Sequence, residues 1–221
     1  MKKRTFWRTL SLLLLALGFA ALGSTRFQPV AAQEEDPLTP EDAAARAAYM
    51  QRFEADQQAP MALAPLSATP CVGGMAGIYP CENVDLLAFL PLASIGGGNG
   101  NDSWGWTDPL DGKEYAIMGR TSGTSFVDIS DPENPIYLGN LPTQTSNSIW
   151  RDIKVYNNYA FIVSEASGHG MQVFDLTRLR TLKPQANGLP VKVEYDSLYK
   201  EIASAHNIVI NEESGYAYSV G

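Results

Sequence analysis

Six polar residues have types and spacings that could support binding or metal chemistry: Asp108, Arg151, Asp152, His169, His206 and Asn207. The carboxylate oxygens of Asp108 and Asp152 are ligands that suit Ca²⁺. The sequence holds two histidines, so a three-histidine zinc site cannot form from this chain alone. A site of His169 and His206 with one carboxylate, from Asp152 or Glu165, remains an alternative.

A structural role is the competing interpretation, and it is the one we favour. Asp128, Asp131 and Asp175 stand where the chain must turn, and aspartate caps turns by accepting backbone N–H groups. Asp152 would similarly join neighbouring structural units. No GxSxG run provides a serine nucleophile. We therefore predict no catalytic residue, and an enzymatic activity is less expected than its absence.

Three Tyr-Ala pairs mark the elements that must position these residues. They begin at Tyr115, Tyr159 and Tyr216, with spacings of 44 and 57 residues. Short β-branched and aromatic runs surround each pair, and turn sequences such as Asp-Gly separate the runs. A period in the forties with four short strands per unit is typical of a β-propeller blade.

The prediction is therefore an all-β fold of propeller-like four-stranded blades in residues 101–221. The blades cover about 103–142, 146–195 and, truncated, 203–221. An antiparallel β-sandwich is the alternative. Because propellers close with about 4–8 blades, we expect an incomplete ring and a chain that is a fragment. Residues 93–221 alone are then expected to be poorly soluble, because an open strand edge invites aggregation.

Aligning the repeats places Thr107-Asp108, Arg151-Asp152 and His206-Asn207 near equivalent positions. If these pairs begin the inner strands, they gather at one mouth of a central channel, where polar groups commonly bind ligands. His169 lies between two glycines that permit close approach of a partner. Arg151, Asp152, His169, His206 and Asn207 are the predicted ligand-binding residues.

The N-terminal region predicts export. Five basic residues and no acidic residue precede position 33. Residues 10–22 form an apolar run of 13 residues. Such a run is shorter than the roughly 20 residues that span a bilayer and fits a signal peptide over residues 1–32. An uncleaved N-terminal anchor is the alternative.

Two segments connect this leader to the repeats. Residues 33–70 are a linker with a predicted helix near 41–58, and residues 71–100 form a segment with two cysteines. In an exported chain, Cys71 and Cys81 most simply form one disulfide. Separate thiols, or pairing with another chain, are the alternatives. Val84–Leu92 is either a first strand or an apolar plug.

The charge excludes one class of partner. Sixteen basic and 24 acidic residues give a net charge of −8, and without the leader 11 basic residues face 24 acidic ones. Such a surface repels phosphate backbones, so nucleic acid is not an expected partner.

Four runs carry a family resemblance: Cys71–Leu92, Trp104–Leu141 with its VDISDP sequence, Trp150–Leu179 and His206–Gly221. Across residues 71–221 the chain resembles the N-terminal half of the choice-of-anchor B family of bacterial surface proteins with LVIVD-type repeats. The resemblance implies an exported protein with a propeller-like domain, held at the surface by a C-terminal anchor that this sequence does not include.

The predicted function is a binding or scaffolding role outside the cell, with an extracellular protein or glycan as partner. Membrane contact is expected only through the leader or the missing anchor. No cofactor is predicted beyond a candidate Ca²⁺. The alternative is a metal-dependent extracellular hydrolase or lyase acting at the propeller channel.

Overall fold

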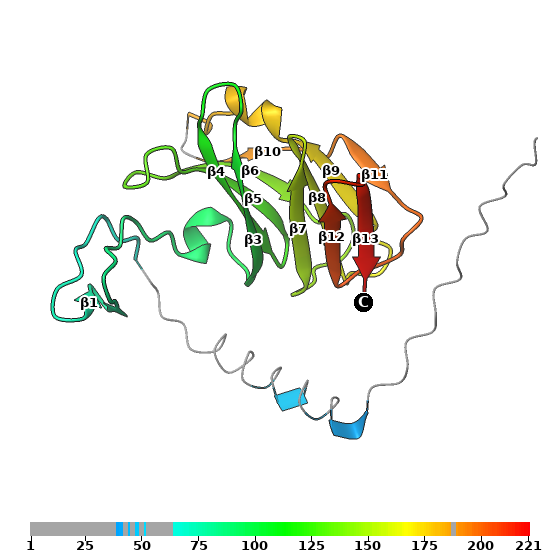
Figure 1. Ribbon diagram of the computed structural model, residues 1–221, viewed down its shortest axis with the longest axis horizontal. Coiled ribbons are helices and arrows are strands. Elements are labelled where there is room, and N and C mark those ends of the chain that lie inside the picture. The colour runs from blue at the N-terminus through cyan, green and yellow to red at the C-terminus, as the bar shows by residue number, and fades with distance from the viewer. Residues whose placement is uncertain (1–38, 42–43, 45–46, 49–50, 52–63, 187–188) are drawn as a thin grey trace, which may run out of the picture. The chain divides into compact units, whose positions relative to one another are not determined.

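A computed structural model describes residues 39–41, 44, 47–48, 51, 64–186 and 189–221 (Figure 1). The described residues all belong to one compact unit, residues 39–221. The predicted signal peptide and most of the predicted linker helix lie outside the described residues. Within the described ranges, no helix has the length and apolarity needed to cross a membrane.

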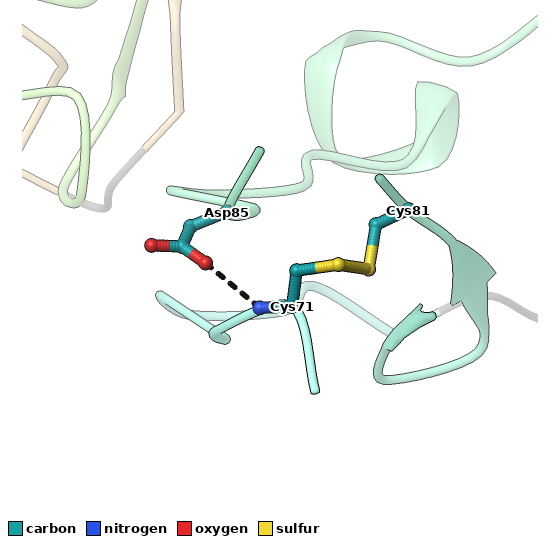
Figure 2. The surroundings of a disulfide bond; sticks show 3 residues. All are labelled: Cys71, Cys81 and Asp85. Atoms are coloured by element: carbon teal, nitrogen blue, oxygen red, sulfur yellow. Dashed lines mark hydrogen bonds between the residues drawn. A yellow bond between two sulfur atoms is a disulfide. The ribbon is translucent and has the colours of Figure 1, made fainter. Parts of the chain in front are cut away.

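A small disulfide-closed segment precedes the sheets. Cys71 and Cys81 are bonded, as predicted, around a hairpin of β1 (Met75–Ala76) and β2 (Tyr79–Pro80). The Cys71 N–H donates to the Asp85 carboxylate at 2.8 Å (Figure 2). The run from Val84 to Leu92 is not a strand. It makes only isolated bridges before the 3₁₀ helix η1 (Leu92–Ile95).

The first sheet is antiparallel over four strands and corresponds to the first predicted blade. Its strands are β3 (Gly100–Thr107), β4 (Glu114–Arg120), β5 (Gly123–Asp128) and β6 (Ile136–Pro142). A short fifth strand, β10 (Val191–Lys192), pairs in parallel with the outer edge of β6.

The second sheet also has four antiparallel strands: β7 (Arg151–Tyr156), β8 (Tyr159–Ser164), β9 (Met171–Asp175) and β11 (Ser197–Tyr199). The 3₁₀ helix η2 (Leu176–Thr181) follows β9. One boundary prediction is wrong. The second blade was expected to end near residue 195, but β10 joins the first sheet and the fourth strand is β11.

The C-terminal hairpin is formed by β12 (Asn207–Asn211) and β13 (Tyr216–Val220). It lies beside β7, and β3 lies on the other side of β7 (Figure 1). The described chain is mostly β-sheet and forms no closed barrel. The all-β prediction is therefore confirmed, whereas assembly into a propeller ring stays a prediction.

The main core lies between the first and second sheets. Phe126 of β5 and Phe174 of β9 are both fully buried, and their rings stack with centroids 4.6 Å apart. Alternation along the strands brings these apolar side chains to facing sides. The core also contains Tyr115, Ile117, Leu138, Leu141, Ile153, Ile162, Leu176 and Leu179.

The turn aspartates act as predicted. Asp128, Asp131 and Asp175 each accept the backbone N–H two residues ahead, at 2.9, 3.2 and 2.9 Å. These side chains satisfy donors that the sharply turning backbone would otherwise leave unpaired.

Candidate functional site

The edge strands β3 and β7 and the hairpin strand β12 carry a row of equivalent polar residues. Their pairing with β4, β8 and β13 aligns Asp102 with Asp152 and with Asn207. The alignment of Thr107-Asp108 with Arg151-Asp152 was therefore wrong, because Asn101-Asp102 occupies that position. We call Asp102, Asp152, Lys154 and Trp104 the acidic cluster.

Asp102 and Asp152 each join one unit to the next. Asp102 accepts the Ile153 N–H at 2.8 Å, and Asp152 accepts the Ile208 N–H at 2.6 Å. These N–H groups lie on the strand edges that face the preceding unit. The same side-chain contact is thus repeated at both junctions, which confirms the structural role predicted for Asp152.

The two carboxyl groups also hydrogen-bond to each other, and their pKa values move apart. Burial and the hydrogen bond with Asp152 raise the pKa of Asp102. Burial alone would raise the pKa of Asp152 as well, but hydrogen bonds from Asp102, Lys154 and the Ile208 N–H outweigh it and lower that pKa. Of the two carboxyl groups, Asp102 is therefore the one that takes up a proton more readily as the pH falls.

Lys154 contacts both carboxyl groups and links them to an aromatic surface. Its ammonium lies 2.6 Å from Asp152 Oδ1, 3.5 Å from Asp102 Oδ2 and 4.6 Å from the centroid of the Trp104 ring. Trp104 is 42% exposed. The cluster therefore offers a carboxyl group, an ammonium and an indole at one partly accessible place.

Replacing Asp152 with alanine is expected to lower the free energy of unfolding by about 2–3 kcal/mol, because it removes hydrogen bonds made to a charged group. Asp152→Asn keeps an acceptor for the Ile208 N–H and should lose only about 1 kcal/mol. Urea unfolding followed by tryptophan fluorescence measures both. The exposed turn variant Asp131→Ala is the control, and equal losses in Asp152→Ala and Asp131→Ala contradict the proposed junction.

Arg151 and His169 lie inside the protein rather than at a channel mouth. Both are fully buried. Arg151 donates to His169 Nε2 at 3.0 Å and to Thr143 Oγ1 at 2.8 Å. The Nδ1–H of His169 donates to the Gly170 carbonyl at 2.9 Å, so the imidazole is neutral and has no free nitrogen for a metal.

The pKa values of this pair agree with that geometry. Burial, with the Arg151 cation adding to it, lowers the pKa of His169 to about 4. Burial and the nearby Arg120 cation lower the pKa of Arg151 to about 10. Arg120 is itself buried, and it donates to the Gly96 and Gly97 carbonyls at 2.9 and 3.0 Å.

His206 belongs to a separate, more exposed group. Its Nδ1 lies 2.5 Å from Glu165 Oε1, and its ring centroid is 5.2 Å from that of Trp150. Asn207 is exposed at the start of β12. The structure therefore separates His206 from His169, and the two-histidine site is not formed.

Asp108 lies at the other end of β3 from Asp102. It is buried and receives two hydrogen bonds from Arg180, at 2.6 and 2.7 Å. The Arg180 guanidinium lowers the pKa of Asp108 despite its burial. This carboxylate is fully used within the fold, as bidentate pairing with arginine usually implies.

The candidate metal ligands thus do not converge. Among the described residues, no group of three His, Cys, Asp or Glu side chains could hold a metal ion. Sequence reasoning missed Asp102, Lys154 and Arg120. An Asp two residues before a Lys or Trp, near the start of the first strand of each sheet, is the pattern that could have pointed to Asp102 and Asp152.

No protein-family model, curated protein or solved structure matches the chain.

Proposed function

We propose that the protein is an exported repeat protein of propeller-like architecture, with a binding or scaffolding role outside the cell. The disulfide supports an oxidising compartment. The apolar leader supports export, and the resemblance to the choice-of-anchor B family supports surface display. Two successive four-stranded sheets followed by a hairpin support the blade interpretation.

The acidic cluster is the observation that carries the binding role. Trp104 presents a partly exposed indole beside the Lys154 ammonium and the Asp102 carboxyl group. Aromatic rings flanked by hydrogen-bonding groups suit flat polar ligands such as sugar rings and the side chains of protein partners. The ligand we propose is an extracellular glycan or protein surface that contacts this cluster.

Binding to arrays of extracellular glycans and matrix proteins tests the role. We expect Trp104→Ala to weaken binding by at least about tenfold, because removing one well-packed aromatic contact costs on the order of 1.4 kcal/mol or more. Trp104 is accessible enough for the fold to persist, and circular dichroism checks this.

Leu110→Ala is the matched control, since Leu110 is exposed in the turn after β3 and lies outside the cluster. Equal binding by wild type and Trp104→Ala contradicts the assignment of the site. Release of cleaved polymer by wild type, lost in Asp102→Asn, would indicate the hydrolase or lyase alternative instead, because carboxyl pairs with separated pKa values serve general acid–base catalysis.

A further inference from the structure

The first sheet, the second sheet and the C-terminal hairpin are three successive units, and each has two faces. The junction between the two sheets and the junction between the second sheet and the hairpin use these faces in the same way. We call the face toward the following unit the leading face and the face toward the preceding unit the trailing face. At the first junction, Ile117 and Phe126 on the leading face of the first sheet pack against Ile162 and Phe174 on the trailing face of the second. These side chains are fully buried.

The second junction repeats this arrangement between the second sheet and the C-terminal hairpin. Val163, on the leading face of β8, packs with Ile208 of the hairpin and with Ala205 before it. Phe161 and Met171 extend the contact. Leading faces therefore meet trailing faces at both junctions.

The first sheet has a trailing face that no described unit covers in this way. The strand pairings make Ala116, Met118 and Val127 the equivalents of Ala160, Ile162 and Phe174. The three residues of the second sheet are fully buried. In the first sheet Ala116 and Met118 are half-buried and Val127 is 5% exposed, and all three line an open groove of about 1010 Å³. The other wall of the groove comes from residues 87–93 and is also mainly apolar.

The C-terminal hairpin has the complementary surface. Tyr216, Tyr218 and Val220 are the leading-face residues of β13 and are 66%, 52% and 49% exposed. Their equivalents Tyr115 and Ile117 in the first sheet are at most 1% exposed. At both internal junctions a leading face of this kind is covered by the trailing face of the following unit. On the hairpin the same kind of surface is exposed.

The hydrogen bond that joins the units also has a candidate acceptor on the hairpin and a candidate donor in the groove. Asp102 and Asp152 bind the backbone N–H groups of Ile153 and Ile208. The next residue in that series is Asn207, which is exposed and can accept a hydrogen bond through its amide oxygen. The equivalent of Ile153 in the first sheet is Ser103, which lines the groove.

We propose that two copies of this chain associate head to tail, with the C-terminal hairpin of one copy in the groove of the other. Tyr216, Tyr218 and Val220 enter the groove beside Ala116, Met118 and Val127, and Asn207 accepts the Ser103 N–H of the second copy. We choose a second copy as the occupant because the new contact would bring together the same equivalent positions that meet at the two internal junctions. Such a heterologous contact leaves the opposite surface of each copy available to make it again.

Sedimentation velocity of the full chain over a range of concentrations tests the proposal. We expect dimers or larger assemblies at concentrations on the order of 10–100 µM. Met118→Asp in the groove and Tyr218→Asp on the hairpin should each raise the dissociation constant on the order of a hundredfold, because either change buries an unpaired charge. Leu110→Asp, on an exposed turn, is the control and should leave it unchanged.

Mixing the two variants distinguishes head-to-tail association from a symmetric contact. One intact hairpin and one intact groove remain in the mixture, so we expect dimers of two chains that neither variant forms alone. A monomeric wild type, or variants that do not complement each other, overturns the proposal. All samples include the same residues 1–32, so any difference in association between them arises from the substitutions.

Cross-linking provides a readout that does not depend on the stability of the aspartate variants. The two native cysteines are bonded to each other, and the sequence contains no others. We expect a chain with Met118→Cys to form a disulfide-linked dimer when oxidised with a chain carrying Tyr218→Cys. Absence of this product, with Leu110→Cys as the background control, also overturns the proposal.

Discussion

Replacing Phe174 with alanine is expected to lower the free energy of unfolding by about 3–5 kcal/mol. The ring is fully buried, stacks on Phe126 at 4.6 Å and supports the Arg178 guanidinium, which lies 4.8 Å from its centroid. Its loss opens a cavity between the two sheets that rigid strands cannot close. Urea unfolding of the full chain, followed by circular dichroism, measures the change.

Leu110→Ala is the control for this experiment. Leu110 is 73% exposed, so its truncation should change the free energy of unfolding by no more than about 0.5 kcal/mol. If Phe174→Ala costs as little as Leu110→Ala, the two sheets do not share the core described above.

Acidification from pH 6.5 to pH 4 is expected to remove on the order of 3 kcal/mol of stability through His169 alone. Burial beside Arg151 holds the pKa of His169 at about 4, against 6.5 when exposed. In that window the unfolded chain binds a proton that the folded chain does not, so the free energy of unfolding falls as the pH falls. Urea unfolding at several pH values between 4 and 7.5 measures the slope.

His169→Gln separates this contribution from those of the other groups. Glutamine provides an oxygen near the position of Nε2 that can accept from Arg151, but it does not titrate. The variant should be less stable than wild type at pH 7.5 and should show a flatter dependence between pH 6.5 and 4. The low pKa of Asp108 gives an acid loss at still lower pH, outside this window. An unchanged slope contradicts the buried neutral imidazole.

The strands could be predicted because their positions depend on patterns in the local sequence. Tyr-Ala pairs, β-branched runs and Asp-containing turns mark β4, β8 and β13, and each forms where the sequence indicates. The turn roles of Asp128 and Asp175 were equally predictable, since they depend on bonds to residues only two positions away.

The candidate site was harder to predict because hairpin lengths differ. Counting seven residues back from Tyr115 and from Tyr159 aligns Asp108 with Asp152. In the first sheet a long turn separates β3 from β4, whereas Asn157-Asn158 alone turns β7 into β8. The true equivalent, Asp102, also lies within a register shift of β3, between Gly100 and Ser103, which no spacing rule anticipates.

The burial of His169 was unpredictable for another reason. Its partner Arg151 comes from a different strand, and the contact depends on how the ASGHG turn folds back onto the sheet. A histidine between glycines looks accessible in sequence, but here the glycine carbonyl and the arginine take both of its nitrogens. Only the tertiary arrangement decides between the two cases.

The return of the chain to the first sheet after β9 affects how the protein is made. Strand β10 completes the outer edge of β6, and Arg180 reaches back to Asp108. As the chain is synthesised from its N-terminus, the first sheet keeps an open edge, and the Asp108 carboxylate lacks its Arg180 partner, until residues 180–192 have emerged. The two sheets should therefore acquire protease resistance together, and cutting the gene between them should yield two insoluble products rather than two modules.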